Sequence, residues 1–304
     1  MARSQTQVWL ILIVLLCLVC YLPGQSKKPQ VPLFRADVVT VFVKVAVSDP
    51  LDRYVTGLEK EDFKIYEDNV EQDISHFSQE SAPISVGLLF DISNSMGFGR
   101  HIQTAKKYFL PMLESSKPED EYFLVTFNNK VNMIQAFTQN TAEVQNQITY
   151  QKAGGWTAVY DAVYMGLDQV RRGKNEKKAL ILITDGEDNS SRYRFSEIRE
   201  FCQESSVQIY AIGLPGPEGY GGGLLKELVN LTGGRVFFPD RGTGLEYYFD
   251  LIHTELRNQY LLGYVPKNTA RDGKWRQIIV KLDAPRGLPK LSIRAKKGYY
   301  APSN

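Results

Sequence analysis

Four uninterrupted apolar runs constrain the fold of this 304-residue chain more than any other feature. They are ISVGLLF (84–90), YFLVTF (122–127), ALILIT (179–184) and VQIYAIGL (207–214). A strand with one face in water alternates apolar and polar residues, whereas a strand covered on both faces does not. The four runs therefore predict the central strands of a mostly parallel sheet that is covered on both sides.

The segments between these runs have the periodicity of helices that cover such a sheet. Apolar residues recur at helical spacing over 102–113, 159–170 and 245–256. The segment VNMIQAF (131–137) follows the second run after a short polar turn, which indicates an antiparallel edge hairpin. We therefore predict an α/β domain over 83–258, with a doubly wound, mostly parallel, Rossmann-like sheet.

The two flanks of this domain, 31–80 and 259–304, are rich in strand patterns. In DVVTVFVKVAV (37–47), valines alternate with other residues at the period of a strand. The segment 62–78 looks like two strands joined at Asp68 and Asn69, and further strand patterns follow residue 259. Neither flank alone could bury a core, so we expect them to pack together as one β-sandwich-like domain.

Residues 1–25 have the pattern of an export signal. Arg3 precedes an almost wholly apolar segment from Val8 to Leu22, which is short for a transmembrane helix. This pattern predicts either a cleaved signal peptide or an uncleaved N-terminal anchor, and the anchor would be the only contact with a membrane. The mature protein is then exported, to the periplasm or to the cell surface and the extracellular space.

The charge of the chain argues against nucleic-acid binding. The formal net charge is +2, and both signs are spread along the sequence. Recognition of a phosphate backbone needs a concentrated basic face. We therefore expect no nucleic-acid partner.

Three predicted loops carry oxygen-bearing side chains at the carboxyl edge of the sheet, where open α/β sheets bind their ligands. The first loop carries Asp91, Ser93 and Ser95, the second carries Thr157 in GGWTAVYDA, and the third carries Asp185 in ITDGED. Two carboxylates and three hydroxyls suit Mg²⁺, or Mn²⁺ and Ca²⁺ with less discrimination. The loops contain no His or Cys, which disfavours zinc. Neutral hydroxyl ligands leave the cation attractive to an external anion.

Simpler interpretations exist for some of these residues. Asp91 and Ser93 could cap the helix that follows them, because Asp and Ser favour that position. Glu187, Asp188 and Asn189 could form a solvated loop, or could tune the charge at the site. Helix capping does not explain why Thr157 and Asp185 follow other strands of the same sheet.

Together these motifs resemble the von Willebrand factor A domain. The resemblance rests on Asp-x-Ser-x-Ser at 91–95, a threonine in a Gly-rich loop at 157, and Thr-Asp-Gly at 184–186. With its flanks, the chain also resembles a bacterial branch of VWFA-related domains of acidobacterial type. The resemblance covers nearly the whole mature chain.

The resemblance implies a metal-ion-dependent adhesion site. Ser93, Ser95 and Thr157 would bind the ion directly or through water. Asp91 and Asp185 would act through water or the serine hydroxyls. An Asp or Glu carboxylate of a protein partner would complete the coordination. Trp156 stands where the family often has a small residue; it could narrow access or anchor a partner, and with Glu187 and Asp188 it forms a predicted partner-binding rim.

The resemblance implies an exported, non-enzymatic adhesion module, and two alternatives stay open. The first is a metal-dependent hydrolase or phosphotransferase. A nucleophilic aspartate at position 91 would need a carboxylate at position 93, where this chain has serine, although Glu187 or Asp188 could activate a metal-bound water. The second is a structural scaffold of a surface assembly, which would use the same metal.

Overall fold

The computed structural model describes residues 39–79, 82–114, 116–185, 188–215, 222–239, 245–285 and 287–303. The predicted signal peptide or anchor at 1–25 lies outside these residues. Among the described helices, none is long and apolar enough to cross a membrane.

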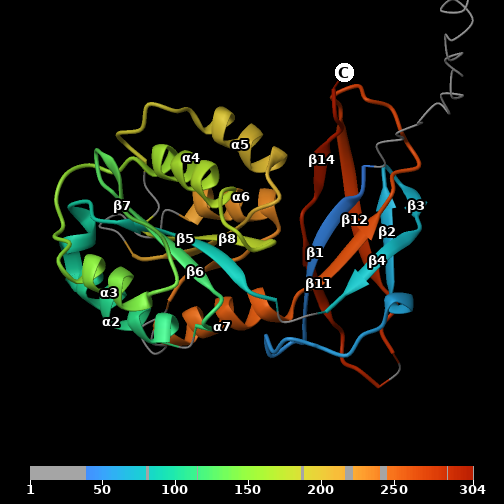
Figure 1. Cartoon of the computed structure of the whole chain (residues 1–304), viewed down its shortest axis with the longest axis horizontal. Coiled ribbons are helices and arrows are strands. Elements are labelled where there is room, and N and C mark those ends of the chain that lie inside the picture. The colour runs from blue at the N-terminus through green and yellow to red at the C-terminus, as the bar shows by residue number, and fades with distance from the viewer. Residues whose placement is uncertain are drawn as a thin grey trace, which may run out of the picture. The chain divides into compact units, whose positions relative to one another are not determined.

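A six-stranded sheet forms the centre of the α/β part, and Figure 1 labels its strands β5, β6, β7 and β8. The full strand order is β10-β9-β8-β5-β6-β7. All of its neighbours pair in parallel except β7, which pairs antiparallel with β6 at the edge. The strands are β5 (Ile84–Asp91), β6 (Glu121–Phe127), β7 (Val131–Thr138), β8 (Lys177–Thr184), β9 (Gln208–Gly213) and β10 (Val236–Phe237). The four apolar runs and the edge hairpin are therefore strands, as predicted.

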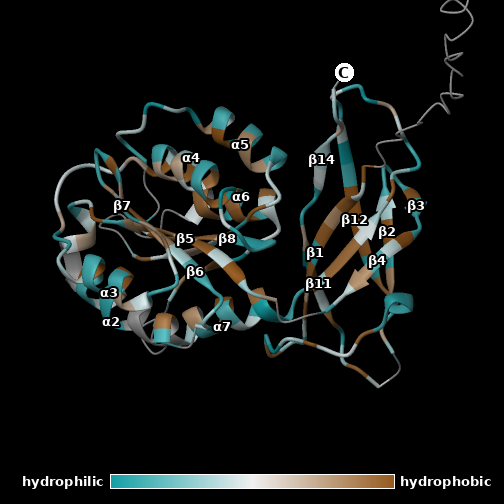
Figure 2. Ribbon diagram, viewed as in Figure 1, coloured by the Kyte–Doolittle hydropathy of each residue, from teal (hydrophilic) through white to brown (hydrophobic). Residues whose placement is uncertain are grey.

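Helices cover both faces of this sheet. One face packs against α2 (His101–Glu114), α3 (Thr141–Thr149) and α7 (Leu245–Asn258). The other face packs against α4 (Val159–Val170), α5 (Phe195–Glu204) and α6 (Gly222–Thr232). Consecutive residues of β5 belong to opposite layers: Leu88 lies in the first apolar cluster and Leu89 in the second. Figure 2 shows the resulting concentration of hydrophobic residues on the central strands. The doubly wound fold is confirmed.

The flanking segments form two antiparallel sheets around a third apolar cluster. The strand orders are β13-β1-β11-β4 and β14-β12-β2-β3, so each sheet contains strands from both ends of the described chain. The strands are β1 (Val41–Ser48), β2 (Phe63–Glu67), β3 (Val70–Gln72), β4 (Ile74–Ser78), β11 (Tyr260–Tyr264), β12 (Trp275–Leu282), β13 (Ser292–Ala295) and β14 (Gly298–Tyr300). The expected β-sandwich-like arrangement of the flanks is therefore present.

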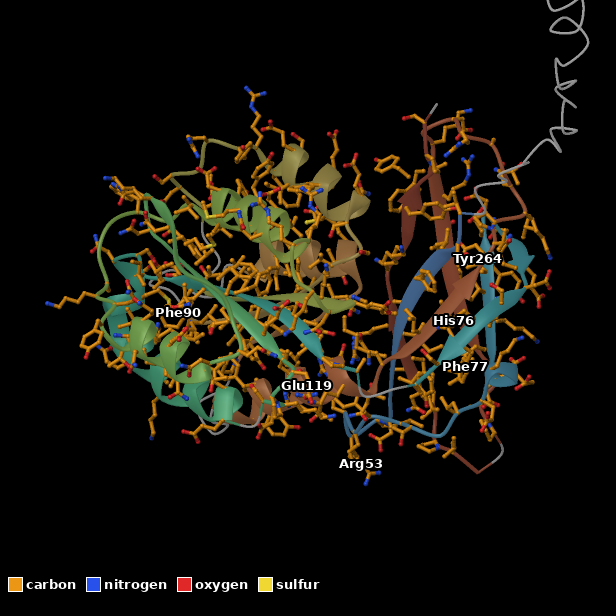
Figure 3. All side chains as sticks on the ribbon, viewed as in Figure 1. Arg53, His76, Phe77, Phe90, Glu119 and Tyr264 are labelled. Carbon is orange, nitrogen blue, oxygen red and sulfur yellow. The ribbon has the colours of Figure 1, made fainter. Side chains whose placement is uncertain are left out.

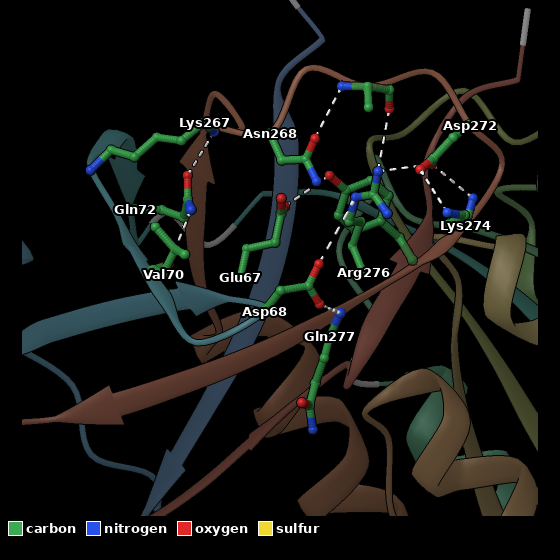
Figure 4. A network of polar contacts seen from close by, with 12 residues as sticks. Glu67, Asp68, Val70, Gln72, Lys267, Asn268, Asp272, Lys274, Arg276 and Gln277 are labelled. Carbon is green, nitrogen blue, oxygen red and sulfur yellow. Dashed lines mark hydrogen bonds and ion pairs between the residues drawn. The ribbon is translucent and has the colours of Figure 1, made fainter.

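The segment 62–78 contains three strands, where the sequence predicted two. The predicted turn at Asp68 and Asn69 exists, with φ values of 49° and 66°, which are typical of a tight hairpin. The Asp68 carboxylate accepts a hydrogen bond from the Gln277 backbone N–H at 2.9 Å, which ties the turn to β12 (Figure 4). The chain then leaves this sheet at residue 73, and β4 pairs with β11 in the other sheet. The uninterrupted strand pattern gave no sign of this change of sheet.

A buried carboxylate on α7 connects the α/β part to the β-rich part. Glu255 is fully buried and accepts hydrogen bonds from the Tyr54 hydroxyl at 2.6 Å and from Arg294 at 2.8 Å. Both partners lie in the flanking segments, whereas Tyr210 of β9 donates to the same carboxylate at 3.0 Å. Residues 39–304 form one compact unit. The domain boundaries at 31–80, 83–258 and 259–304 stay predictions.

Candidate metal centre

The first two elements of the site are the neighbouring strands β5 and β8. They pair in parallel, with Phe90 opposite Ile183, so their carboxyl ends lie at one edge of the sheet. Asp91 is the last residue of β5, not a loop residue as expected from the sequence. Asp185 directly follows β8. The strand register therefore places the two carboxylates at adjacent strand ends.

Asp91 organises the loop that follows it. Its carboxyl group is fully buried; one oxygen accepts from the Ser93 backbone N–H at 2.7 Å, and the other from the Thr184 hydroxyl at 2.6 Å. The Ser93 and Ser95 hydroxyl oxygens lie 3.0 Å apart. Both serine hydroxyls thus face the same point, which is an arrangement that can offer two oxygen ligands to one ion.

The protonation of Asp91 reflects this enclosed position. Burial and, to a smaller extent, the negative charge of Asp185 raise the pKa of Asp91 to about 7. The hydrogen bonds from Thr184 and Ser93 oppose this rise because they favour the ionised carboxylate. Two carboxylates that share a dry site repel one another, and a bound cation would relieve that repulsion.

Asp185 has an unused ligand atom. The residue is 2% exposed, and its Oδ1 is buried with no hydrogen-bond partner among the described residues. Buried polar atoms in native proteins are nearly always satisfied, so an orphaned carboxylate oxygen indicates a ligand such as a metal ion or its water. His101 lies in the same environment: the charge of Asp185 raises its pKa, but burial has the larger effect and lowers it.

Backbone hydrogen bonds position the loop that carries Thr157. The Gly154 N–H donates to Ile92 O at 2.8 Å, and the Asn94 N–H donates to Gly155 O at 2.9 Å. These two bonds fasten the second loop to the loop after β5. Thr157 is 3% exposed, and it precedes α4 by two residues. The structure therefore brings the second loop against the Asp-x-Ser-x-Ser segment.

The third loop also contacts Thr157. Asn189 accepts a hydrogen bond from the Thr157 backbone N–H at 2.8 Å through its side chain, and its own N–H donates to Thr157 O at 3.0 Å. The sequence singles out Thr184 only as part of the Thr-Asp-Gly motif, predicts Asn189 as part of a solvated loop, and predicts no role for His101. A threonine directly before Asp185 was a usable signal for Thr184, but nothing in the sequence indicated the contacts of the other two.

The three residues of the predicted partner-binding rim differ from one another in the structure. Trp156 is 68% exposed beside buried Thr157, so its indole is available to a partner. Asp188 is engaged internally, because its Oδ1 accepts from the Tyr160 backbone N–H at 3.2 Å and from the Ser191 hydroxyl at 2.6 Å. The Asp188 carboxylate therefore binds the first turn of α4. Glu187 lies outside the described residues.

The donor set fits a hard divalent cation. The described part of the chain holds no group of three or more His, Cys, Asp or Glu side chains that could bind a metal. The candidate centre has only two such side chains, and its other three members are hydroxyls. This composition suits Mg²⁺, which keeps several of its waters, better than it suits zinc.

Comparison with known proteins identifies the α/β part. Residues 86–187 match the family model of the von Willebrand factor type A domain. Inter-alpha-trypsin inhibitor heavy chain H3 from Pongo abelii is 25% identical over 142 residues, which are 42% of this chain and 16% of that protein. The uncharacterized protein sll0103 from Synechocystis sp. is 27% identical over 135 residues, which are 43% of this chain and 32% of that protein.

A solved structure, the von Willebrand factor type A protein from Catenulispora acidiphila, shares the fold with a TM-score of 0.53 and 12% identity. The similarity covers 87% of this chain and 75% of that one. Residues 86–187 are therefore similar to the von Willebrand factor type A domain, and the solved structure shows that the fold is shared. The matched region spans only 16% of the heavy chain and 32% of the Synechocystis protein.

Proposed function

We propose that this chain is an exported, non-enzymatic adhesion module that captures an acidic group of a protein partner through a divalent cation. The observation that carries the proposal is the buried, unpartnered Oδ1 of Asp185, next to a strand end where Asp91 is equally buried. Ser93, Ser95 and Thr157 hold the ion directly or through water. Asp91 and Asp185 balance its charge. The motifs and the flanks further support membership of the bacterial acidobacterial-type branch.

The cation supplies an electrophilic centre for a carboxylate. Because the three side chains that hold the ion are neutral hydroxyls, the ion keeps enough positive charge to attract an Asp or Glu of the partner. Exposed Trp156 lies beside Thr157 and offers an aromatic anchor at the edge of the contact. A structural scaffold would use the same ion. The two roles are distinguished by purification, because a scaffold co-purifies stoichiometrically with its assembly.

Metal binding is tested by isothermal titration of the EDTA-treated chain with Mg²⁺, Mn²⁺ and Ca²⁺. The test variant combines Ser93→Ala with Ser95→Ala, because the Ser93 backbone N–H still donates to Asp91 and the loop keeps its shape. We expect the variant to bind the cation at least about tenfold more weakly. Ser196→Ala, at an exposed position of α5, is the matched control and keeps full affinity. Equal affinity in the double variant and the control contradicts the proposal.

Capture of an acidic group is tested on carboxymethylated and uncharged dextran surfaces. We expect the chain to bind the carboxylated surface in Mg²⁺ and to be released by EDTA, whereas the uncharged surface retains nothing. Trp156→Ala should keep the affinity for the ion, because the indole is not a ligand. Retention that is equal on the two surfaces, or unchanged by EDTA, removes the support for metal-bridged capture.

The absence of turnover is part of the proposal. Ser93 stands where an acid/base carboxylate would be needed, and the Asp188 carboxylate already accepts two hydrogen bonds. We expect no hydrolysis of p-nitrophenyl phosphate in Mg²⁺ above the rate of an Asp91→Asn variant. Activity that this variant loses would establish the hydrolase alternative.

A further inference from the structure

A cavity of about 450 Å³ lies at the amino ends of β8 and β9, at the edge of the sheet opposite the candidate metal centre. The α/β part contributes Glu176, Gln208 and Thr232, among others, to its lining. Strands β1, β4 and β11 of the flanking segments contribute Phe42, Lys44, His76 and Leu261, and Lys296 follows β13. The cavity is therefore lined by both parts of the fold.

Two lysines of this cavity have no acidic partner. Neither Lys44 nor Lys296 forms an ion pair with any carboxylate in the described ranges. The Lys44 ammonium donates to backbone carbonyls, those of Lys178 at 3.2 Å and Ser206 at 3.3 Å. The Lys296 ammonium lies 5.8 Å from the centre of the Tyr299 ring. Glu176 also lines the cavity, but it is exposed and pairs with neither lysine.

The electrostatics of the cavity favour an anion. Burial, together with the positive charges of Lys296, Lys177 and Lys178, lowers the pKa of Lys44 to about 7. Burial also lowers the pKa of Lys296 to about 8. Partly buried ammonium groups that repel one another are destabilising unless a negative charge compensates them.

The rest of the lining suits an organic molecule. Phe42 is 47% exposed, and its ring meets the His76 ring edge-on at 5.6 Å. Figure 3 places His76 and its neighbour Phe77 on β4, and Phe77 packs inside the β-rich part against Phe63 and Tyr260. Gln208 is 2% exposed, and its Oε1 is buried with no hydrogen-bond partner within the described residues. The lining thus offers an apolar surface and one free acceptor.

We propose that this cavity is a second binding site, which takes a small organic anion with a carboxylate or phosphate group. The anionic group faces Lys44 and Lys296, and the apolar body lies against Phe42 and Leu261. A hydroxyl or N–H of the ligand donates a hydrogen bond to the free Oε1 of Gln208. The site does not depend on the metal centre, and it takes residues from both parts of the fold, so a bound ligand would hold them together.

The test uses the full chain in EDTA at low salt and about pH 6, where most of both lysine side chains are protonated. The probes are phenyl phosphate, benzoate and inorganic phosphate, and binding is measured by isothermal titration. Phenyl phosphate and benzoate share the apolar ring, so they separate phosphate from carboxylate recognition. We expect at least one of them to bind more tightly than inorganic phosphate, because only they fill the apolar part of the cavity.

Lys44→Met and Lys296→Met should each weaken this binding about tenfold or more, because each removes a charge-assisted hydrogen bond to the anion. Lys297→Met is the matched control: it removes the same charge at the next, exposed residue and should leave the affinity unchanged. The Ser93→Ala, Ser95→Ala variant should also bind normally, so failure of the metal site is distinguished from failure of this one. The proposal is overturned by equal losses in Lys296→Met and Lys297→Met, or by no binding of any probe.

Discussion

At the scale of single residues, Gly155 determines the shape of the loop that carries Thr157. Its φ of 86° lies in the left-handed region, and a Cβ at this position would collide with the Asn129 side chain. A Cβ at adjacent Gly154 would meet no heavy atom within 4 Å, and the φ of Gly154 is not in the left-handed region. A side chain can therefore be accommodated at Gly154 but not at Gly155 without strain.

We predict that Gly155→Ala lowers the free energy of unfolding by about 1–3 kcal/mol, because alanine would have to adopt a left-handed backbone conformation. It should also weaken Mg²⁺ binding, since the loop that positions Thr157 must shift. Urea unfolding and isothermal titration measure the two effects. Gly154→Ala is the control and should change neither quantity appreciably. Equal effects of the two substitutions would refute this account of the loop.

The residue scale also shows how far the site could be predicted. Asp91, Ser93 and Asp185 can be recognised because they closely follow apolar runs, and Thr157 because it stands in a Gly-rich loop at the start of a predicted helix. Asn189 cannot, because its contact with Thr157 depends on how two loops meet, 32 residues apart in the chain. Asp188 was placed on the rim because a charged loop residue is normally solvated, but its carboxylate accepts from the first turn of α4.

At the scale of elements, α7 contains a histidine that the fold holds neutral. His253 accepts hydrogen bonds from the Arg257 side chain at 3.0 and 3.1 Å, and Arg257 also pairs with buried Asp120. Burial and the positive charges of Arg257 and Lys117 together lower the pKa of His253 to about 4, against the opposing charge of Asp120. Protonation of His253 would set two cations against each other on one helix.

We predict that this helix makes the protein less stable in mild acid. The unfolded chain takes up a proton at His253 near pH 6.5, whereas the folded chain resists until about pH 4. The stabilisation from neutral His253 is therefore complete above about pH 6.5 and is lost as the pH falls towards 4. Urea unfolding at several pH values should show a smaller decrease for His253→Gln than for wild type. Parallel curves would contradict this role.

The helices and strands could be predicted where the periodicity of apolar residues determines them, and could not be predicted elsewhere. The strands of the central sheet lack polar alternation because both of their faces are covered, which is a property of the sequence itself. The division of 62–78 into β2, β3 and β4 depends on partners more than 180 residues away, since β4 pairs with β11. A local pattern contains no information about that choice.

At the scale of the whole molecule, Glu255 connects the two parts of the fold. It is fully buried, whereas the Arg294 side chain is 22% exposed, and the pair is joined at 2.8 Å. An exposed pair offers a comparison: Arg199 and Glu227 join α5 to α6, and their side chains are 48% and 45% exposed. The two glutamates both lie on helices and both pair with arginine, but only one of them is shielded from water.

We predict that Glu255→Ala lowers the free energy of unfolding by about 3–5 kcal/mol, because it leaves Arg294 and two tyrosine hydroxyls without their acceptor. Glu255→Gln should lose less, since its single amide oxygen still accepts from one of the two tyrosines. The control Glu227→Ala should lose less than about 1 kcal/mol. Urea unfolding followed by tyrosine fluorescence measures all three. Similar losses for Glu255→Ala and Glu227→Ala would show that the contacts of Glu255 contribute little to the stability of the fold.

The interleaving of the flanks has a consequence for the order of folding during synthesis. Strands β1 and β2 leave the ribosome early, but their partners β11, β12 and β13 begin only at Tyr260. The α/β part is complete by Asn258, so it can fold while β1 still lacks both neighbours. Until the last segment emerges, β1 presents two unpaired edges, which is the state most exposed to mispairing. The last folding step is therefore the pairing of β11 and β13 with β1 and of β12 with β2.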